Sequence, residues 1–132
     1  MVFQFNASQF DFDFVALYIA FSNEEKGQHY FLMQREEDSL ESTLPNMDNI
    51  YIELDDQGWG GYGGIDAVIL TPNSLTVKFN QKMTKIMGNY SSIKVTFTMN
   101  NLQFQNLESL LRKIMFGYAE KLLVTEDKKV LV

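Results

Sequence analysis

Apolar and polar residues alternate along several short segments of this chain, and this alternation restricts the fold more than any other feature. In the segment 93–99, four apolar residues alternate with Lys94, Thr96 and Thr98. Successive side chains of a β-strand point to opposite faces of the sheet, so the pattern predicts a strand with one buried face. Comparable patterns predict strands at residues 2–5, 10–21, 28–34, 49–55, 65–70 and 75–79.

Helical spacing is convincing mainly near the C-terminus. A helix is predicted to begin near Asn106, a residue type favoured as an N-cap, with Glu108 in the first turn. Its apolar stripe consists of Leu107, Leu110, Leu111, Ile114 and Tyr118. A shorter helix is predicted over residues 81–87, ending at Gly88 and Asn89.

These segments together predict a single α+β domain over residues 1–132. Short turns between consecutive strands favour antiparallel pairing, because parallel strands need longer crossover connections. The expected architecture is a mostly antiparallel β-sheet of six to seven strands with a C-terminal helix packed on one face. Residues 35–48 and 119–132 carry no decisive pattern, although a last edge strand over residues 129–132 fits the sequence.

The net charge of −6 conceals an asymmetry between the two halves of the chain. Residues 1–66 contain 13 acidic residues and two basic ones, whereas residues 67–132 contain four acidic and nine basic residues. An acidic half repels phosphate backbones and attracts a basic partner, although acids also serve solubility alone. With no cysteine, no signal peptide and no apolar run of membrane-spanning length, we expect a cytoplasmic protein.

Residues 58–64 hold five of the eight glycines and the only tryptophan. Because glycine gives up backbone entropy on folding, this stretch is predicted to be a loop placed for its shape or for a close approach. Trp59 and Tyr62 lie there among acids, which is typical of binding anchors. The alternative is that Trp59 folds back and closes one end of the sheet.

Catalytic and metal-binding patterns are weak. His29 is the only histidine and lies within a predicted strand, so an ordinary strand residue is the simplest interpretation. Asp55, Asp56 and Asp66 lack the calcium-loop pattern, and the glycines are not followed by the lysine and helix of a phosphate loop. We therefore assign no catalytic residue, metal or cofactor.

Two motifs adjoin or include the glycine-rich stretch. The first is the run Tyr51-Ile52-Glu53-Leu54-Asp55-Asp56-Gln57, and the second is Tyr62-Gly63-Gly64-Ile65, with Leu70 and residues 75–79 following. Together they resemble the immunity protein 10 family, whose members are thought to neutralise toxins of bacterial polymorphic and contact-dependent inhibition systems. Residues 93–97 and 107–116 are similar to the closing elements of the family.

The resemblance implies a non-enzymatic inhibitor that binds one toxin domain, expected to be a nuclease-type effector, and covers its active or substrate-binding surface. It marks Glu53, Asp56, Gln57, Tyr62, Gly63 and Gly64 as candidate contacts with the toxin, and the residues alone add Asp55 and Trp59. Two alternatives remain. One is a small-ligand or carbohydrate-binding module that uses the aromatic glycine-rich stretch. The other is an enzyme in which Glu53 or Asp55 acts with His29.

Overall fold

The computed structural model describes residues 1–23, 29–36 and 40–125, and in this part of the chain ten strands form two five-stranded sheets. The antiparallel sheet has the order β2-β3-β4-β5-β6. Its strands are β2 (Gln9–Asp13), β3 (Tyr18–Ser22), β4 (Tyr30–Arg35), β5 (Ile50–Leu54) and β6 (Asp56–Tyr62). Each pairs with the next one along the chain, so this sheet is a simple meander.

The mixed sheet has the order β1-β9-β8-β7-β10. Its strands are β1 (Val2–Asn6), β7 (Ile65–Thr71), β8 (Ser74–Phe79), β9 (Ser92–Thr96) and β10 (Leu122–Val124). The three central strands are antiparallel, whereas β1 pairs with β9 and β10 pairs with β7 in parallel. Both ends of the described chain therefore supply the edges of this sheet.

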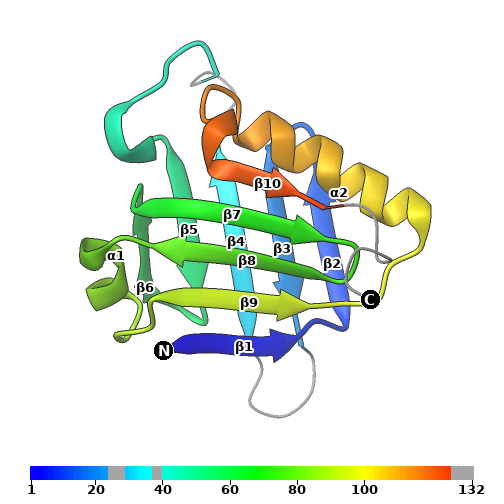
Figure 1. The fold of residues 1–132 in the computed structure, drawn as a ribbon, viewed down its shortest axis with the longest axis horizontal. Helices are drawn as coiled ribbons and strands as arrows, with labels where there is room; N and C mark the ends of the chain where they lie inside the picture. Colours follow the sequence, from blue (N-terminus) through cyan, green and yellow to red (C-terminus); the bar gives the residue numbers. More distant parts are fainter. Residues whose placement is uncertain (24–28, 37–39, 126–132) are drawn as a thin grey trace.

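The two sheets pack face to face, and Figure 1 shows their strands crossing steeply. The inner face of the antiparallel sheet consists of Ile19, Phe21, Phe31, Met33, Ile50, Ile52 and Leu54. The mixed sheet presents Val68, Leu70, Leu75, Val77, Ile93 and Val95. Phe21 of β3 stacks on Phe97, just after β9, with ring centroids 5.5 Å apart. These apolar faces form one continuous core, as the alternating pattern predicts.

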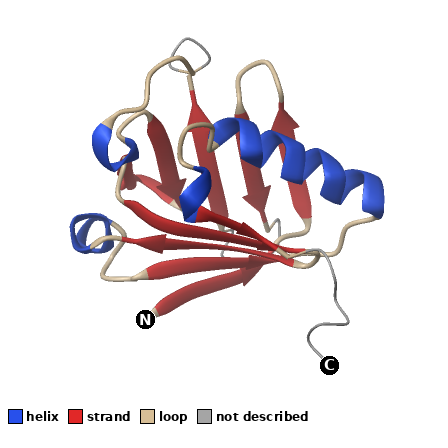
Figure 2. Cartoon of the chain, turned by 45° about the horizontal axis from the view of Figure 1, so that its top comes forward, coloured by secondary structure: helices blue, strands red, loops and turns tan. Residues whose placement is uncertain are grey.

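Helix α2 (Asn101–Ile114) covers one end of this core and packs against β2 and β3. Figure 2 shows it lying across the antiparallel sheet, above the edge of the mixed sheet. Its buried residues are Leu107, Leu110, Leu111 and Ile114, four members of the predicted stripe. The α+β class with a C-terminal helix is confirmed, and the number of strands is higher than six to seven. No helix among the described residues is long and apolar enough to cross a membrane.

Several predicted boundaries differ from the structure for local reasons. Helix α2 begins at Asn101 and not near Asn106, because Asn100 and Gln103 form a reciprocal capping box. The first turns are largely polar, so the apolar stripe does not mark this start in the sequence. The predicted strand over residues 10–21 is interrupted by a turn in which the Asp13 carboxylate accepts the amide hydrogens of Val15 and Ala16 at 2.8 Å. The short helix α1 (Gln81–Ile86) was predicted at nearly the observed place.

The C-terminal and central segments that the sequence left open are also structured in part. Residues 45–47 form the short 3-10 helix η2 (Pro45–Met47), and η3 (Ala119–Lys121) leads into β10. The suggested edge strand over residues 129–132 lies outside the described residues.

Arg35 is the most consequential polar residue of the interior. Its side chain is fully buried although it stands at the end of β4. Its Nη1 donates to the carbonyls of Ile114 and Phe116 at 2.9 and 2.6 Å, and Nη2 donates to the Ser42 carbonyl at 3.1 Å. These contacts place a cation at the C-terminal end of α2, where the helix dipole favours one. Burial lowers the pKa of the guanidinium, yet an arginine stays charged at neutral pH.

The substitution Arg35→Met should lower the free energy of unfolding by about 3 kcal/mol or more, because it leaves buried carbonyls without their donor. Urea denaturation followed by circular dichroism measures the loss. Arg112→Met is the matched control, since Arg112 is exposed and pairs with Glu108 one turn away in α2; we expect a change below about 0.5 kcal/mol. Equal effects of the two substitutions would show that the buried contacts add no stability.

Candidate functional site

The prediction that the glycine-rich stretch forms a loop is wrong for residues 58–62. These residues belong to β6, the edge strand of the antiparallel sheet. It pairs with β5 in register, with Tyr51 opposite Tyr62 and Glu53 opposite Gly60. A Cβ on Gly60 would lie 2.7 Å from the Tyr51 hydroxyl and 3.0 Å from the Ile52 carbonyl oxygen. Gly60 is therefore required for the close approach of a tyrosine ring, which agrees with the prediction that the glycines permit a close approach. Backbone flexibility is not its role.

Gly63 and Gly64 form the sharp connection from β6 to β7. Both are buried and both have positive φ, +76° and +78°, a region that side chains with a Cβ rarely occupy. A Cβ on Gly64 would lie 2.6 Å from the Cβ of Met83 in α1. The Gly64 carbonyl also accepts the amide hydrogen of Asn80, the residue that caps α1. Gly64 is thus fixed in place by the packing of α1, whereas Gly63 lies against Asn46 and Asp48.

Trp59 and Tyr62 lie on opposite faces of β6. The Trp59 ring is half-buried, covers Gly88 and lies beside Tyr90, with ring centroids 6.2 Å apart. Tyr62 is 58% exposed and faces outward, 5.2 Å from the Tyr51 ring. The geometry favours the interpretation in which Trp59 closes the end of the sheet, and leaves Tyr62 available on the surface.

Glu53 lies on the outer face of β5 between two tyrosines. Its carboxylate accepts short hydrogen bonds from the hydroxyls of Tyr30 and Tyr51. The hydrogen bond to Glu53, followed by burial, raises the pKa of Tyr51 to about 12. The pKa of Tyr30 is also raised, mainly by burial and to a smaller extent by its hydrogen bond to Glu53. The carboxylate thereby holds both rings in one orientation.

Asp55 occupies the bulge between β5 and β6, with φ of 63°. One carboxylate oxygen lies 2.7 Å from His29 Nδ1, and the other accepts the Tyr30 amide hydrogen at 3.0 Å. These contacts join the start of β4 to the β5–β6 turn. Asp56 is exposed and accepts the Gly58 amide hydrogen at 2.8 Å. Gln57 follows in β6, and its side chain lies outside the described part of the structure.

Beyond the predicted residues, the structure gathers four tyrosines on one face of a sheet, which the sequence did not indicate. The outer face of the antiparallel sheet carries Tyr18, Tyr30, Tyr51 and Tyr62, each from a different strand. Asp11 accepts the Tyr18 hydroxyl at 2.8 Å, and this bond raises the pKa of Tyr18. The sequence shows that Tyr51 and Glu53 share one face of a predicted strand. It does not show the strand register that places the other tyrosines on the same face of the sheet.

Charge differs between the two sheets. The strands of the antiparallel sheet contain the acids Asp11, Asp13, Glu53 and Asp56 and a single base, the buried Arg35. The strands of the mixed sheet contain Lys78 and Lys94 against one acid, Asp66. The acidic half of the chain thus becomes an acidic sheet, and the basic half supplies most of the other.

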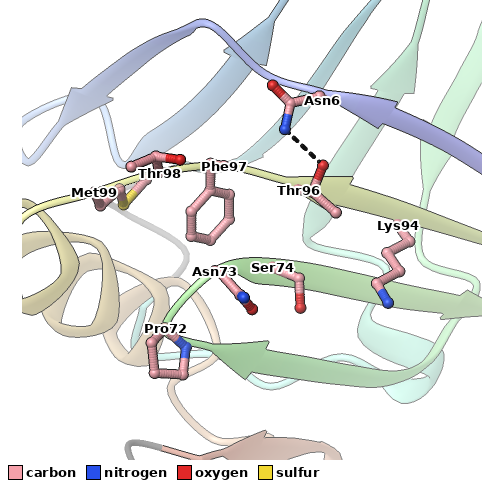
Figure 3. A pocket seen from close by; sticks show the side chains of 9 residues that line it. All are labelled: Asn6, Pro72, Asn73, Ser74, Lys94, Thr96, Phe97, Thr98 and Met99. Carbon is pink, nitrogen blue, oxygen red and sulfur yellow. Dashed lines mark hydrogen bonds between the residues drawn. The ribbon is translucent and has the colours of Figure 1, made fainter. Parts of the chain in front are cut away.

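The mixed sheet bears a separate polar pocket of about 410 Å³ on its outer side. Figure 3 shows Asn6, Thr96 and Lys94 along β1 and β9, with Asn73 on the β7–β8 turn. Asn6 donates to the Thr96 hydroxyl at 2.8 Å. None of the predicted site residues lines this pocket. Among the described residues, no group of three or more histidine or acidic side chains could hold a metal ion.

Comparison with known proteins gives one match. The family model described as Immunity protein 10 matches residues 3–105. The match begins far before residue 51, where the motifs start, and includes all five strands of the antiparallel sheet. It ends at residue 105, so residues 107–116, interpreted from the sequence as similar to a closing element of the family, lie outside it. No curated protein and no solved structure matched the chain.

Replacing Gly64 by alanine should lower the free energy of unfolding by about 3 kcal/mol, because the left-handed backbone is strained and the added Cβ overlaps Met83. Gly58→Ala, in the preceding strand β6, is the control. Its Cβ would lie 3.6 Å from the nearest neighbouring atom, and we expect a change within about 0.5 kcal/mol. Chemical denaturation of both variants measures the difference. Equal stabilities would contradict the structural role assigned to Gly64.

Tyr51 should ionise at about pH 12 in the folded protein, against about 10 in the unfolded chain. Because the folded pKa is the higher one, its contribution to stability is complete below pH 10 and disappears between pH 10 and about 12. Difference ultraviolet titration of the wild type against Tyr51→Phe isolates this ionisation. Glu53→Gln should move it toward pH 10, and Asp66→Asn on β7 should leave it unchanged. An unshifted value in Glu53→Gln would show that the carboxylate does not hold the ring.

Proposed function

The chain belongs to the immunity protein 10 family, and we propose that it binds a cognate bacterial toxin domain and neutralises it by covering its active or substrate-binding surface. The family match over residues 3–105 carries this proposal. Membership of a family of immunity proteins suggests that this protein acts as an inhibitor and not as an enzyme. The partner implied is a protein, and no cofactor is required.

The distribution of charge supports a toxin with a basic surface. The strands of the antiparallel sheet carry four acids, and their one arginine is buried. Enzymes that cleave nucleic acids bind phosphate backbones with lysine and arginine. We therefore propose that the toxin is a nuclease-type effector of contact-dependent growth inhibition or of a related polymorphic toxin system. An acidic inhibitor would occupy the surface that the nucleic acid uses.

Such an inhibitor acts by occlusion and needs no conformational change in the toxin. Opposite charges accelerate the encounter and orient the partners, while buried aromatic contacts slow dissociation. We propose that this takes place in the bacterial cytoplasm, where an incoming nuclease meets its substrate. Fast, tight binding is the property that protects a cell from even a few molecules of an enzyme.

The carbohydrate-binding alternative finds no support in the geometry. It requires Trp59 and Tyr62 to form one platform, but they lie on opposite faces of β6. It also requires Asp55 to face a ligand, whereas both of its carboxylate oxygens are engaged by His29 and Tyr30.

The enzymatic alternative requires His29 and an acid to meet in a concave site. His29 does meet Asp55, but the pair is packed beside the rings of Phe3 and Phe5, with centroids 5.0 and 5.8 Å from the imidazole. In this setting the hydrogen-bonded pair closes the corner between β4 and the β5–β6 turn. Its geometry is explained by the fold.

Binding to the toxin domain encoded beside this gene tests the proposal. We expect a complex with a Kd below about 1 µM at physiological salt, together with loss of toxin activity. The association rate should fall as salt is added, because opposite charges steer the encounter. Stopped-flow mixing at several salt concentrations measures the association and dissociation rate constants, and their ratio gives the Kd. Absence of a complex at micromolar concentrations and low salt would overturn the proposal.

A further inference from the structure

We propose that the outer face of the antiparallel sheet is the docking surface for the toxin, and that it receives a surface rich in lysine and arginine. The inference rests on the proposed function and specifies which face of the molecule performs it. We define the tyrosine row as Tyr18, Gln34, Tyr51 and Tyr62, with Asp13 at its end. It is the centre of the proposed surface.

The strand register places the row in a straight line across the sheet. Asp13 of β2 pairs with Tyr18 of β3, and Tyr18 pairs with Gln34 of β4. Gln34 in turn pairs with Tyr51 of β5, and Tyr51 pairs with Tyr62 of β6. The row therefore spans all five strands. Three tyrosines on one rigid line supply large, amphipathic contact area, which is the composition of binding hot spots.

The tyrosines are held in place before any partner arrives. Tyr18 donates to Asp11 at 2.8 Å, and Tyr51 donates to Glu53 from the same strand face. Tyr62 lies against Tyr51 with ring centroids 5.2 Å apart. Side chains that are already ordered lose little conformational entropy on binding, so more of the contact energy appears as affinity.

The carboxylates that orient the rings also set the chemistry of the partner. Asp11, Asp13 and Glu53 lie on this face, and the only cationic side chain of the five strands, Arg35, points into the core. On the opposite side of the molecule, β8 and β9 carry Lys78 and Lys94. Charge complementarity therefore directs a cationic surface to the antiparallel sheet and away from the mixed sheet.

A small pocket beside the row offers a place for one cationic side chain. It has a volume of about 210 Å³ and is lined by Gln34, Glu36, Asn49, Tyr51 and Tyr62. The charged group of an arginine or lysine can lie over a tyrosine ring and near a carboxylate, while its aliphatic stem packs against the rings. Gln34, Tyr51 and Tyr62 belong both to the pocket and to the row, so the pocket lies at the end of the row formed by β4, β5 and β6.

The β2–β3 turn extends the surface with apolar contacts. Phe14 is 41% exposed and Val15 is 78% exposed, although both are apolar. The Asp13 carboxylate fixes their backbone by accepting two amide hydrogens, and Leu17 anchors the turn in the core. Because Asp13 and Tyr18 end the two strands that the turn joins, these apolar residues adjoin the tyrosine row.

Two substitutions with the same chemistry on opposite faces test the inference. Tyr62→Lys places a cation at one end of the row, and Leu123→Lys places one on β10 of the mixed sheet. The two positions are matched, since Tyr62 is 58% and Leu123 57% exposed and both lie on edge strands. We expect Tyr62→Lys to raise the Kd for the neighbouring toxin domain by about tenfold or more, and Leu123→Lys to change it by less than about twofold.

A second measurement needs no substitution and remains valid if Tyr62→Lys fails to fold. Fluorotyrosine is incorporated into the wild type, and its fluorine resonances are followed while the toxin domain is added. We expect Tyr18, Tyr51 and Tyr62 to shift and the buried Tyr118 to stay in place. Selective shifts in the row support the inference.

The outcomes separate the two proposals. If the wild type binds the toxin but Tyr62→Lys binds equally well and the row does not shift, the docking surface is wrong and the proposed function stands. If Leu123→Lys is the weaker binder, the mixed sheet is the docking face and the inference is overturned. If the wild type does not bind at all, the proposed function fails, and the docking surface fails with it.

Discussion

The hydrogen bonds of Arg35 hold together three parts of the chain that are distant in sequence. From the end of β4 its guanidinium reaches the last carbonyls of α2 and the Ser42 carbonyl. The Tyr118 ring lies 5.5 Å away, and its hydroxyl donates to Asn49 and to the Leu44 carbonyl. A single buried cation thus fixes the helix on the antiparallel sheet and orders the segment before β5. The upper end of the proposed docking surface is built on that segment, so its shape depends on an interior contact.

Chain connectivity converts a charge asymmetry of the sequence into a charge asymmetry of the molecule. Residues 9–62 form a complete meander, and residues 65–124 supply four of the five strands of the other sheet. The two halves therefore lie mostly in different sheets; the exceptions are β1, which joins the mixed sheet, and α2, which packs against β2 and β3. A domain in which the halves interleaved would have mixed the same charges, and no acidic face would result. The meander gives the antiparallel sheet its excess of acids, on which the proposed docking surface depends.

The family motif is divided between support and surface. Gly63 and Gly64 are required by backbone conformation and by the packing of α1, and Trp59 covers Gly88. Asp55 is occupied by His29 and a backbone amide. Glu53 and Tyr62 face outward, and Glu53 acts there by orienting two rings. Much of the motif that identifies the family thus shapes the sheet, while the proposed contacts include residues that no motif marks, such as Tyr18 and Gln34.

The sequence by itself determined the class of the fold, the positions of most strands, the buried stripe of α2 and the acidic character of the first half. These properties follow from local periodicity and composition, which the order of residues displays directly. Only the tertiary structure decided the two-sheet arrangement, the parallel pairing of β1 with β9, the strand conformation of the glycine-rich stretch and the burial of Arg35. Each of these depends on contacts between distant segments, and register in particular is set by bulges and turns such as the one at Asp55. For that reason the tyrosine row could not be read from the sequence: its members belong to strands whose alignment exists only in the folded sheet.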